Sequence, residues 1–289
     1  MPTGLAKARP TIRTLLRAER GGVFSEARLR SLFSEHREIW GLGKEVSVSE
    51  FIEFLVKRKE LLKIELRSER YKRLLRYALR GFSPYSMALA LRPRSYLSHG
   101  SAVFLHALNE QLPKTIYVNQ EQTEKPSGGS LSQESLTRAF SNHQRTSGYV
   151  YSMEGYRVVL LSGKHTGNLG VTNARGPGGE ELPVAGIART LVDIAVRPAY
   201  AGGIVQVLEA YRGAKGRVGT QEIVQTLRKL AYVYPYHQAI GFLMERAGFA
   251  PEECAKLLKL GMEFEFYLVH GMKKTAFDKK WRLHFPEGF

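Results

Sequence analysis

The hydrophobic period of the chain changes near residue 61, and this change limits the folds that the first 80 residues can adopt. Before it, apolar residues recur at helical spacing in residues 11–20, 23–33 and 47–60. After it, Leu62, Ile64 and Leu66 alternate with charged residues, as in a half-buried strand. The polar stretch RSERYKR then turns the chain, and LLRYAL can return as a second strand. Residues 68–80 also fit a helix, so the pattern leaves hairpin and helix open there.

Local signals support the three helices. Gly21 and Gly22 end the first helix, and Ser25 is placed to cap the second. Ser47 and Glu50 have the spacing of a capping box before the third. Three helices followed by a basic two-stranded hairpin is the element order of a winged helix-turn-helix, which we therefore expect at the N-terminus.

The positive charge of the chain is concentrated in this region. The 43 Lys and Arg residues against 27 Asp and Glu give a net charge of +16, which favours a polyanionic partner such as nucleic acid or an acidic membrane surface. Residues 57–80 alone contain ten basic and three acidic residues. This local excess favours nucleic acid over a merely basic surface.

A winged helix would place its third helix in the major groove and its hairpin on the flanking backbone. Glu50 and Glu53 begin the solvent face of the third helix and would repel phosphate, although Glu can accept from a cytosine amino group. The hairpin is therefore expected to dominate. The candidate phosphate contacts are Lys57, Arg58, Lys59, Arg67, Arg70, Lys72, Arg73 and Arg76.

Glycine and proline between residues 81 and 93 predict a domain boundary. The expected organisation is a DNA-binding domain over 1–80, a linker over 81–93 and a larger α+β domain over 94–289. In the larger domain, we expect a helix over 99–109 capped by Ser98, strands in the middle, a loop over 121–135, a helical block from residue 188 and a strand-like end.

The cysteine count and the lack of long apolar runs indicate the compartment that we expect for the chain. Cys254 is the single cysteine, so an intrachain disulfide and a cysteine-based zinc site are excluded, and a reducing compartment is indicated. The N-terminus lacks a secretory h-region, and no apolar run reaches 18 residues. We expect a cytoplasmic protein with no membrane span and no cofactor.

Two histidines, His99 and His106, would share one helix face. They lie about 10 Å apart along such a helix, too far to share one metal ion easily, so no metal site is expected. Catalysis would need a partner such as Asp193 brought close by the fold, and packing is the favoured role. The glycine-rich SGKHTGNLG stretch lacks P-loop spacing, which favours a turn over a phosphate site.

Three stretches carry a family resemblance: YLSHGSAVFLHALNEQLPKTIYV, ARTLVDIAVRPAYAGG and YPYHQAIGFLMERAGF. In this order, after a winged-helix-like N-terminus, they resemble the AbiEi-type antitoxins of bacterial type IV toxin–antitoxin systems, which act in abortive infection. The resemblance covers most of the chain. It assigns to the antitoxin domain, without giving them any chemistry, the residues Tyr96, Ser98, His99, Ser101, Ala102, His106, Arg189, Thr190, Asp193 and Pro198.

The resemblance implies a cytoplasmic, non-enzymatic protein with two tasks. Its winged helix binds inverted repeats in its own promoter and represses transcription. Its C-terminal domain neutralises a nucleotidyltransferase-like toxin without needing a stable complex. The protein would be a monomer in solution or a dimer on DNA. The alternative is a nucleic-acid-processing enzyme that captures substrate with the basic N-terminal arm and uses His99, His106 or Asp193 in catalysis, but a nucleophile–base motif is missing from the sequence.

Overall fold

The computed structural model describes residues 4–110, 113–124 and 130–289. These residues form two compact units. Within the described residues, the first unit runs to Arg94 and also includes Tyr149–Val158 and Arg175–Leu182, and the rest forms the second unit. The expected boundaries at 80 and 94 place these two later segments with the second domain, whereas the structure groups them with the first.

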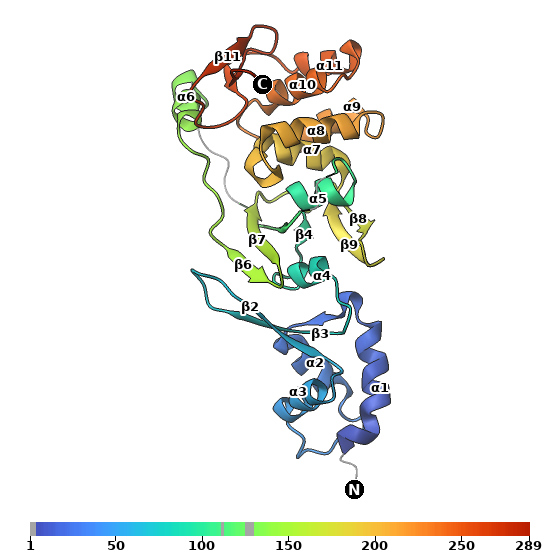
Figure 1. Ribbon diagram of the computed structural model, residues 1–289. Coiled ribbons are helices and arrows are strands. Elements are labelled where there is room, and N and C mark those ends of the chain that lie inside the picture. Colours follow the sequence, from blue (N-terminus) through green and yellow to red (C-terminus); the bar gives the residue numbers. More distant parts are fainter. Residues whose placement is uncertain (1–3, 111–112, 125–129) are drawn as a thin grey trace. The chain divides into compact units, whose positions relative to one another are not determined.

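The first unit begins with three helices and a hairpin (Figure 1). The three helices are those that the hydrophobic period predicts. In chain order its elements are α1 (Gly4–Ala18), η1 (Arg20–Gly22), β1 (Val23–Phe24), α2 (Glu26–His36), α3 (Val48–Lys57), β2 (Leu62–Leu66), β3 (Leu74–Ala78), α4 (Pro84–Leu89) and β6 (Val150–Met153).

The helix boundaries follow from the residues at them. Gly21 and Gly22 both have positive φ, of 74° and 60°, which lets the chain leave α1 for β1. The Ser25 hydroxyl accepts a hydrogen bond from the backbone N–H of Arg28 and caps α2. Ser47 and Glu50 make the expected capping box at α3. The first helix starts at Gly4, earlier than the pattern indicated.

The basic segment after α3 is a hairpin, which decides between the two structures that its sequence allows. Strands β2 and β3 pair antiparallel from Leu62 opposite Ala78 to Leu66 opposite Leu74. Strand β1 pairs with the other edge of β3. Ile64 and Leu66 are buried and Lys63 and Arg67 are exposed, as the alternating pattern predicts.

An aromatic cluster holds the helices of the first unit together. The rings of Phe33 and Phe51 lie 5.1 Å apart, and those of Trp40 and Phe51 lie 5.5 Å apart. Phe33 comes from α2, Phe51 from α3 and Trp40 from the loop between them. All three are buried, so the loop closes the core instead of leaving it open.

The segment expected to be a linker is folded. Ser83 caps α4 by accepting a hydrogen bond from the N–H of Tyr85. Tyr85, Met87 and Ala88 are buried, and the helix belongs to the first unit. This stretch is therefore part of the first unit's packing.

The second unit combines a sheet, a helical block and a small C-terminal sheet. The chain is thus α+β, as expected. The elements are β4 (Tyr96–Leu97), α5 (His99–Leu105), β5 (Thr115–Glu121), α6 (Gln133–Ser141), β7 (Tyr156–Gly163), β8 (Val171–Arg175), β9 (Glu181–Ala185), α7 (Ile187–Val196), η2 (Pro198–Ala201), α8 (Ile204–Ala214), α9 (Thr220–Leu230), α10 (Tyr236–Arg246), α11 (Pro251–Leu258), β10 (Phe266–Tyr267), β11 (Thr275–Asp278) and β12 (Leu283–Pro286). The first residues of β7 and β9 and the last of β8 belong to the first unit.

The larger sheet has the strand order β6-β7-β5-β4-β9-β8. Strand β4 is short, but it runs antiparallel to β5 and parallel to β9. It leads directly into α5, so the sequence YLSH spans the sheet and the start of the helix. The turn at Glu154 and Gly155, with φ of 39° and 82°, joins β6 to β7.

The helical block α7–α11 supplies most of the buried apolar residues of the second unit. Its last part packs on Trp281, which is fully buried. A Cβ at Gly241 of α10 would lie 2.1 Å from that indole, so only glycine fits there. The strand-like end of the chain is three short strands, with β12 between β10 and β11.

Besides α4, which lies in the expected linker, a second helix was not expected. Part of the predicted loop over 121–135 is helical, because α6 begins at Gln133 behind a Ser132 cap. Residues 125–129 of that predicted loop lie outside the described residues.

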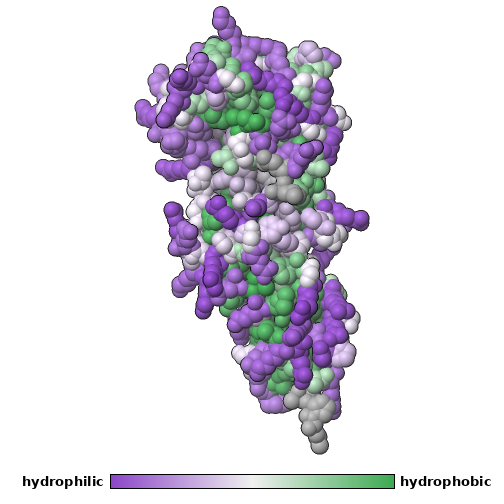
Figure 2. All heavy atoms as spheres, viewed as in Figure 1, coloured by the Kyte–Doolittle hydropathy of each residue, from purple (hydrophilic) through white to green (hydrophobic). Residues whose placement is uncertain are grey.

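Figure 2 shows hydrophilic residues over much of the visible face of each unit, with hydrophobic residues between them.

Candidate nucleic-acid interface and buried polar cluster

The outward face of the hairpin carries its charge. The carboxylate of Glu65 on β2 lies 3.1 Å from the guanidinium of Arg67 and 3.1 Å from that of Arg73. Arg67 comes directly after β2 and Arg73 directly before β3, so the two arginines stand at the two ends of the turn. The two arginine side chains are 82% and 70% exposed. Exposed ion pairs contribute little to stability and are screened by salt. Glu65 therefore orients both guanidinium groups while leaving them open to solvent.

The tip of the hairpin adds two more exposed cations, Arg70 and Lys72. Within the described part of the chain, neither makes an ion pair, unlike Arg67 and Arg73. Four cations against Glu65 and Glu69 leave the turn with a net positive charge.

The end of α3 forms a second group of basic residues. Lys57 pairs with Glu53 at 3.1 Å, and the Arg58 guanidinium lies 5.8 Å from the centre of the Phe54 ring. Lys59 is exposed and has a φ of 56°, so the chain leaves the helix in a left-handed conformation. All three residues are on the surface of the first unit, and Lys57 and Arg58 are held by their neighbours on α3.

The start of α3 is acidic. Glu50 accepts hydrogen bonds from the backbone N–H and the hydroxyl of Ser47, both at 2.8 Å, and these bonds lower its pKa. Its carboxylate therefore stays charged at neutral pH at the helix end that would face DNA. That the hairpin dominates any phosphate contact stays a prediction.

Arg76 differs from the other seven candidates. Its guanidinium donates to the carbonyl oxygens of Leu75 and Ala90 at 2.8 Å, and to that of Leu91 at 3.4 Å. The side chain is half-buried, and burial lowers its pKa. Arg76 thus ties β3 to the end of α4, and we remove it from the candidate phosphate contacts.

Sequence reasoning missed a cluster at Glu60. Its carboxylate accepts from Arg9 at 2.5 Å and from Arg13 at 2.6 and 2.9 Å. The hydrogen bonds from Arg13, with those from Arg9, lower the pKa of Glu60 to about 2. The cluster joins α1 to the connection between α3 and β2. Glu60 is 51 and 47 positions from the two arginines, so no local pattern could have predicted their contact.

In the second unit, three of the family-like residues, Tyr96, Arg189 and Asp193, meet in a buried polar cluster. Arg189 and Asp193, one turn apart on α7, form a buried ion pair at 2.8 Å. Arg189 also donates to the hydroxyl of Tyr96 at 3.3 Å, and Asn119 donates to the same hydroxyl at 2.7 Å. Burial opposes the charge on Arg189, but Asp193 outweighs it and raises the pKa of Arg189. The cluster thereby links α7 to β4 and β5.

The SGKHTGNLG stretch binds an anion that belongs to the chain itself. Glu121 accepts from the backbone N–H of Thr166 at 2.7 Å, from that of Asn168 at 3.2 Å and from the Thr166 hydroxyl. Burial works against ionisation, yet these hydrogen bonds lower the pKa of Glu121. Positive φ at Gly167 and Asn168 lets the loop fold around the carboxylate. The structure thus agrees with the predicted turn.

The two histidines do not share a helix face. His99 has a φ of 50°, so it does not continue a regular helix, and α5 ends at Leu105 before His106. His99 lies edge-on to Tyr200 at 5.3 Å, with Nδ1 2.9 Å from the Ser98 hydroxyl. Burial, with the charges of Arg189 and Arg197, lowers the pKa of His99 to about 3.

His106 has a separate environment. Its Nε2 donates to the carbonyl of Ala185 at 2.7 Å, and burial lowers its pKa. Both histidines are therefore neutral packing groups at physiological pH. Ser98 makes no side-chain cap of α5, contrary to expectation, whereas the Ser101 hydroxyl accepts from the N–H of Tyr117 at 2.8 Å.

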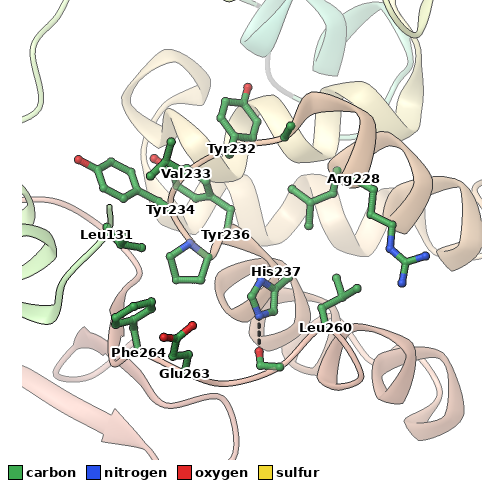
Figure 3. Close-up of a pocket in the computed structure, with 14 residues that line it drawn as sticks. Leu131, Arg228, Tyr232, Val233, Tyr234, Tyr236, His237, Leu260, Glu263 and Phe264 are labelled. Carbon is green, nitrogen blue, oxygen red and sulfur yellow. Dashed lines mark hydrogen bonds between the residues drawn. The ribbon is translucent and has the colours of Figure 1, made fainter. Parts of the chain in front are cut away.

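One pocket of about 350 Å³ lies where α9 meets α10 (Figure 3). Its wall includes Tyr232, Tyr234, Tyr236 and Phe264. His237 donates from Nε2 to the carbonyl of Gly261 at 2.6 Å, so this polar atom is already used. The pocket offers aromatic faces but few convergent polar groups, and we assign it no ligand.

In the described part of the chain, no group of three or more His, Cys, Asp or Glu residues is placed to hold a metal ion. Nor is any of the described helices long and apolar enough to cross a membrane. Cys254 is buried, and burial raises its pKa.

Comparison with known proteins gives a fold and no family. No family model matches the chain, and no curated protein matches it. Among solved structures, the chain is similar to the RV2827C protein from Mycobacterium tuberculosis. The TM-score is 0.58 at 14% sequence identity, over 99% of this chain and 92% of that one. At this identity the likeness concerns the fold alone.

Proposed function

We propose that the chain binds duplex DNA through the basic hairpin of its first unit. The observation that carries the proposal is the position of Arg67, Arg70, Lys72 and Arg73, all exposed on and around the tip of a folded hairpin. Such cations neutralise phosphates and release counterions. They supply affinity and orientation, whereas sequence preference must come from base contacts or DNA shape.

We further propose that the chain is an antitoxin and autorepressor of the type IV class. The support is the order of family-like stretches in the sequence, together with a first unit whose element order suits a winged helix. In this proposal the protein works in the cytoplasm, represses its own operon and neutralises a nucleotidyltransferase-like toxin. The second unit acts through its surface and performs no chemistry, because His99, His106, Arg189 and Asp193 are engaged in packing and buried bonds.

The DNA-binding part is tested with DNA from upstream of the protein's own gene. We expect tighter binding to a fragment with an inverted repeat than to a scrambled fragment of equal length. The variant Arg70→Ala/Lys72→Ala/Arg73→Ala should bind both fragments about ten- to a hundredfold more weakly, because phosphate contacts carry no sequence information. A charge-matched control is Lys229→Ala/Lys256→Ala/Lys259→Ala, which removes three exposed cations of the second unit.

Two results would contradict the proposal. If wild type and control both bind DNA and the hairpin variant binds equally well, the hairpin is not the contact surface. If the protein degrades nucleic acid and His106→Ala abolishes that activity, the enzyme alternative is correct. For the antitoxin part, co-expression with a nucleotidyltransferase-like protein encoded beside the gene should restore growth, and failure to restore it would refute this part.

A further inference from the structure

The hairpin tip is held by an aromatic pair from two distant parts of the first unit. Tyr71 lies between Arg70 and Lys72, and its ring stacks on that of Tyr149 with centroids 4.3 Å apart and an interplanar angle of 16°. The two residues are 38% and 39% exposed. Burial and the contact with Tyr149 raise the pKa of Tyr71. The stack is therefore at the surface, among the proposed DNA contacts.

The backbone joins the same two segments. The N–H of Arg67 donates to the carbonyl of Ser152 at 3.2 Å, and the N–H of Ser152 donates to that of Arg67 at 2.7 Å. This antiparallel bridge begins where β2 ends, and Figure 1 shows β6 beside that part of the hairpin. The guanidinium of Arg92, an exposed residue, lies 5.7 Å from the centre of the Tyr149 ring.

The tip needs such support for two physical reasons. Residues 67–73 are polar, and their four cations repel one another, so the sequence itself does not favour one conformation of the turn. A turn that is ordered only on binding DNA would lose conformational entropy at that step, which weakens affinity. A stacked aromatic pair contributes about 0.5 to 1.5 kcal/mol beyond area burial.

We infer that Tyr149 is a positioning residue for DNA binding, which holds the hairpin tip through Tyr71, while the single backbone bridge between Arg67 and Ser152 ties the end of β2 to β6. The inference rests on the proposed function. It assigns a DNA-binding role to a residue more than 70 positions from the hairpin in sequence, which contributes no charge to the contact.

The test compares Tyr149→Ala with Tyr149→Phe, which keeps the ring, and with Phe277→Ala, which removes a ring of similar exposure from the second unit. We expect Tyr149→Ala to weaken DNA binding about two- to tenfold, the factor equivalent to the stacking energy. The dependence of affinity on salt should stay as in wild type, because no phosphate contact is lost. The other two variants should bind like wild type.

A second readout needs no DNA. Trypsin cleaves after Arg70, Lys72 and Arg73 when the tip opens, so cleavage followed by mass spectrometry should be several-fold faster in Tyr149→Ala than in Tyr149→Phe. Equal cleavage and equal affinity in all variants would overturn the inference. An equal loss of affinity in Tyr149→Phe and Tyr149→Ala would also overturn it, since the hydroxyl would then be the important group.

These measurements distinguish failure of the proposed function from failure of the inference about Tyr149. If wild type binds no DNA, the proposed function fails and the DNA role of Tyr149 fails with it. If wild type binds DNA but Tyr149→Ala binds equally well, only the inference fails. Faster trypsin cleavage in Tyr149→Ala without weaker binding would show that the tip is held but that its order is not used for DNA, which also refutes the inference.

Discussion

Glu65 shows how one residue sets the charge of the hairpin. Its carboxylate lies 3.1 Å from both Arg67 and Arg73 and so holds the two guanidinium groups beside one negative charge. Because both arginines remain mostly exposed, a DNA phosphate can replace or join the carboxylate with little cost in desolvation. Arg76, the residue after Leu75 on β3, instead donates hydrogen bonds to backbone carbonyl groups. The sequence does not reveal which arginine side chains are exposed and which are bound to the backbone. In the structure, this difference separates Arg67 and Arg73 from Arg76.

The buried cluster of the second unit illustrates what residue patterns cannot predict. The i, i+4 spacing of Arg189 and Asp193 allows an ion pair on α7. However, their burial and the link to Tyr96 depend on the packing of α7 against the sheet, about 90 residues away in sequence. The family-like residues could thus be singled out from sequence, but their arrangement could not.

At the residue scale we predict that the Arg189–Asp193 pair is structural. Asp193→Asn should lower the free energy of unfolding by about 3 to 5 kcal/mol, because it leaves a buried guanidinium without its counter-charge. The double variant Arg189→Met/Asp193→Leu should be more stable than Asp193→Asn. Urea denaturation followed by circular dichroism measures both. A loss below about 1 kcal/mol for Asp193→Asn would mean that the pair is not important for the fold.

At the scale of elements, the sequence predicts the parts with strong local signals. The caps at Ser25 and Ser47, the alternating strand β2 and the helical block from α7 to α11 were expected, because each depends on residues a few positions apart. The helix α6 was missed because its apolar face is small: Leu136 and Phe140 are its buried residues. The alternatives for residues 68–80 could be separated only by the pairing of β3 with both β1 and β2.

The ion pairs of Glu60 with Arg9 and Arg13 on α1 should make the stability of the first unit depend on pH. The folded pKa of about 2 lies below the value near 4.3 expected in the unfolded chain. The stabilisation is therefore present above about pH 4.3 and is lost as the pH falls through about 2. Glu60→Gln should melt at a lower temperature than wild type at pH 7, and this difference should shrink progressively below about pH 4.3.

The control for that experiment is Glu38→Gln, which changes an exposed carboxylate of the same unit. Melting followed by circular dichroism between pH 2 and 7 gives the comparison. If wild type and Glu60→Gln differ by the same amount at every pH, the carboxylate does not stabilise the fold through its charge.

At the scale of the whole molecule, the fold groups segments that sequence keeps apart. Residues 149–158 and 175–182 belong to the first unit, although the linker expected at 81–93 suggested two domains consecutive in the chain. Composition could not predict this, because a boundary is read from glycine and proline, whereas the grouping depends on pairings such as that of Arg67 with Ser152. The DNA-binding proposal consequently involves two separate stretches of the chain.

The most direct test of the central claim is the slope of log affinity against log salt concentration for DNA binding. Each phosphate contact on duplex DNA contributes about 0.9 to this slope. We predict that Arg70→Ala/Lys72→Ala/Arg73→Ala reduces the slope by about 2 to 3 units, while Lys229→Ala/Lys256→Ala/Lys259→Ala leaves it unchanged. The same slope in wild type and the hairpin variant would show that the hairpin does not contact phosphates.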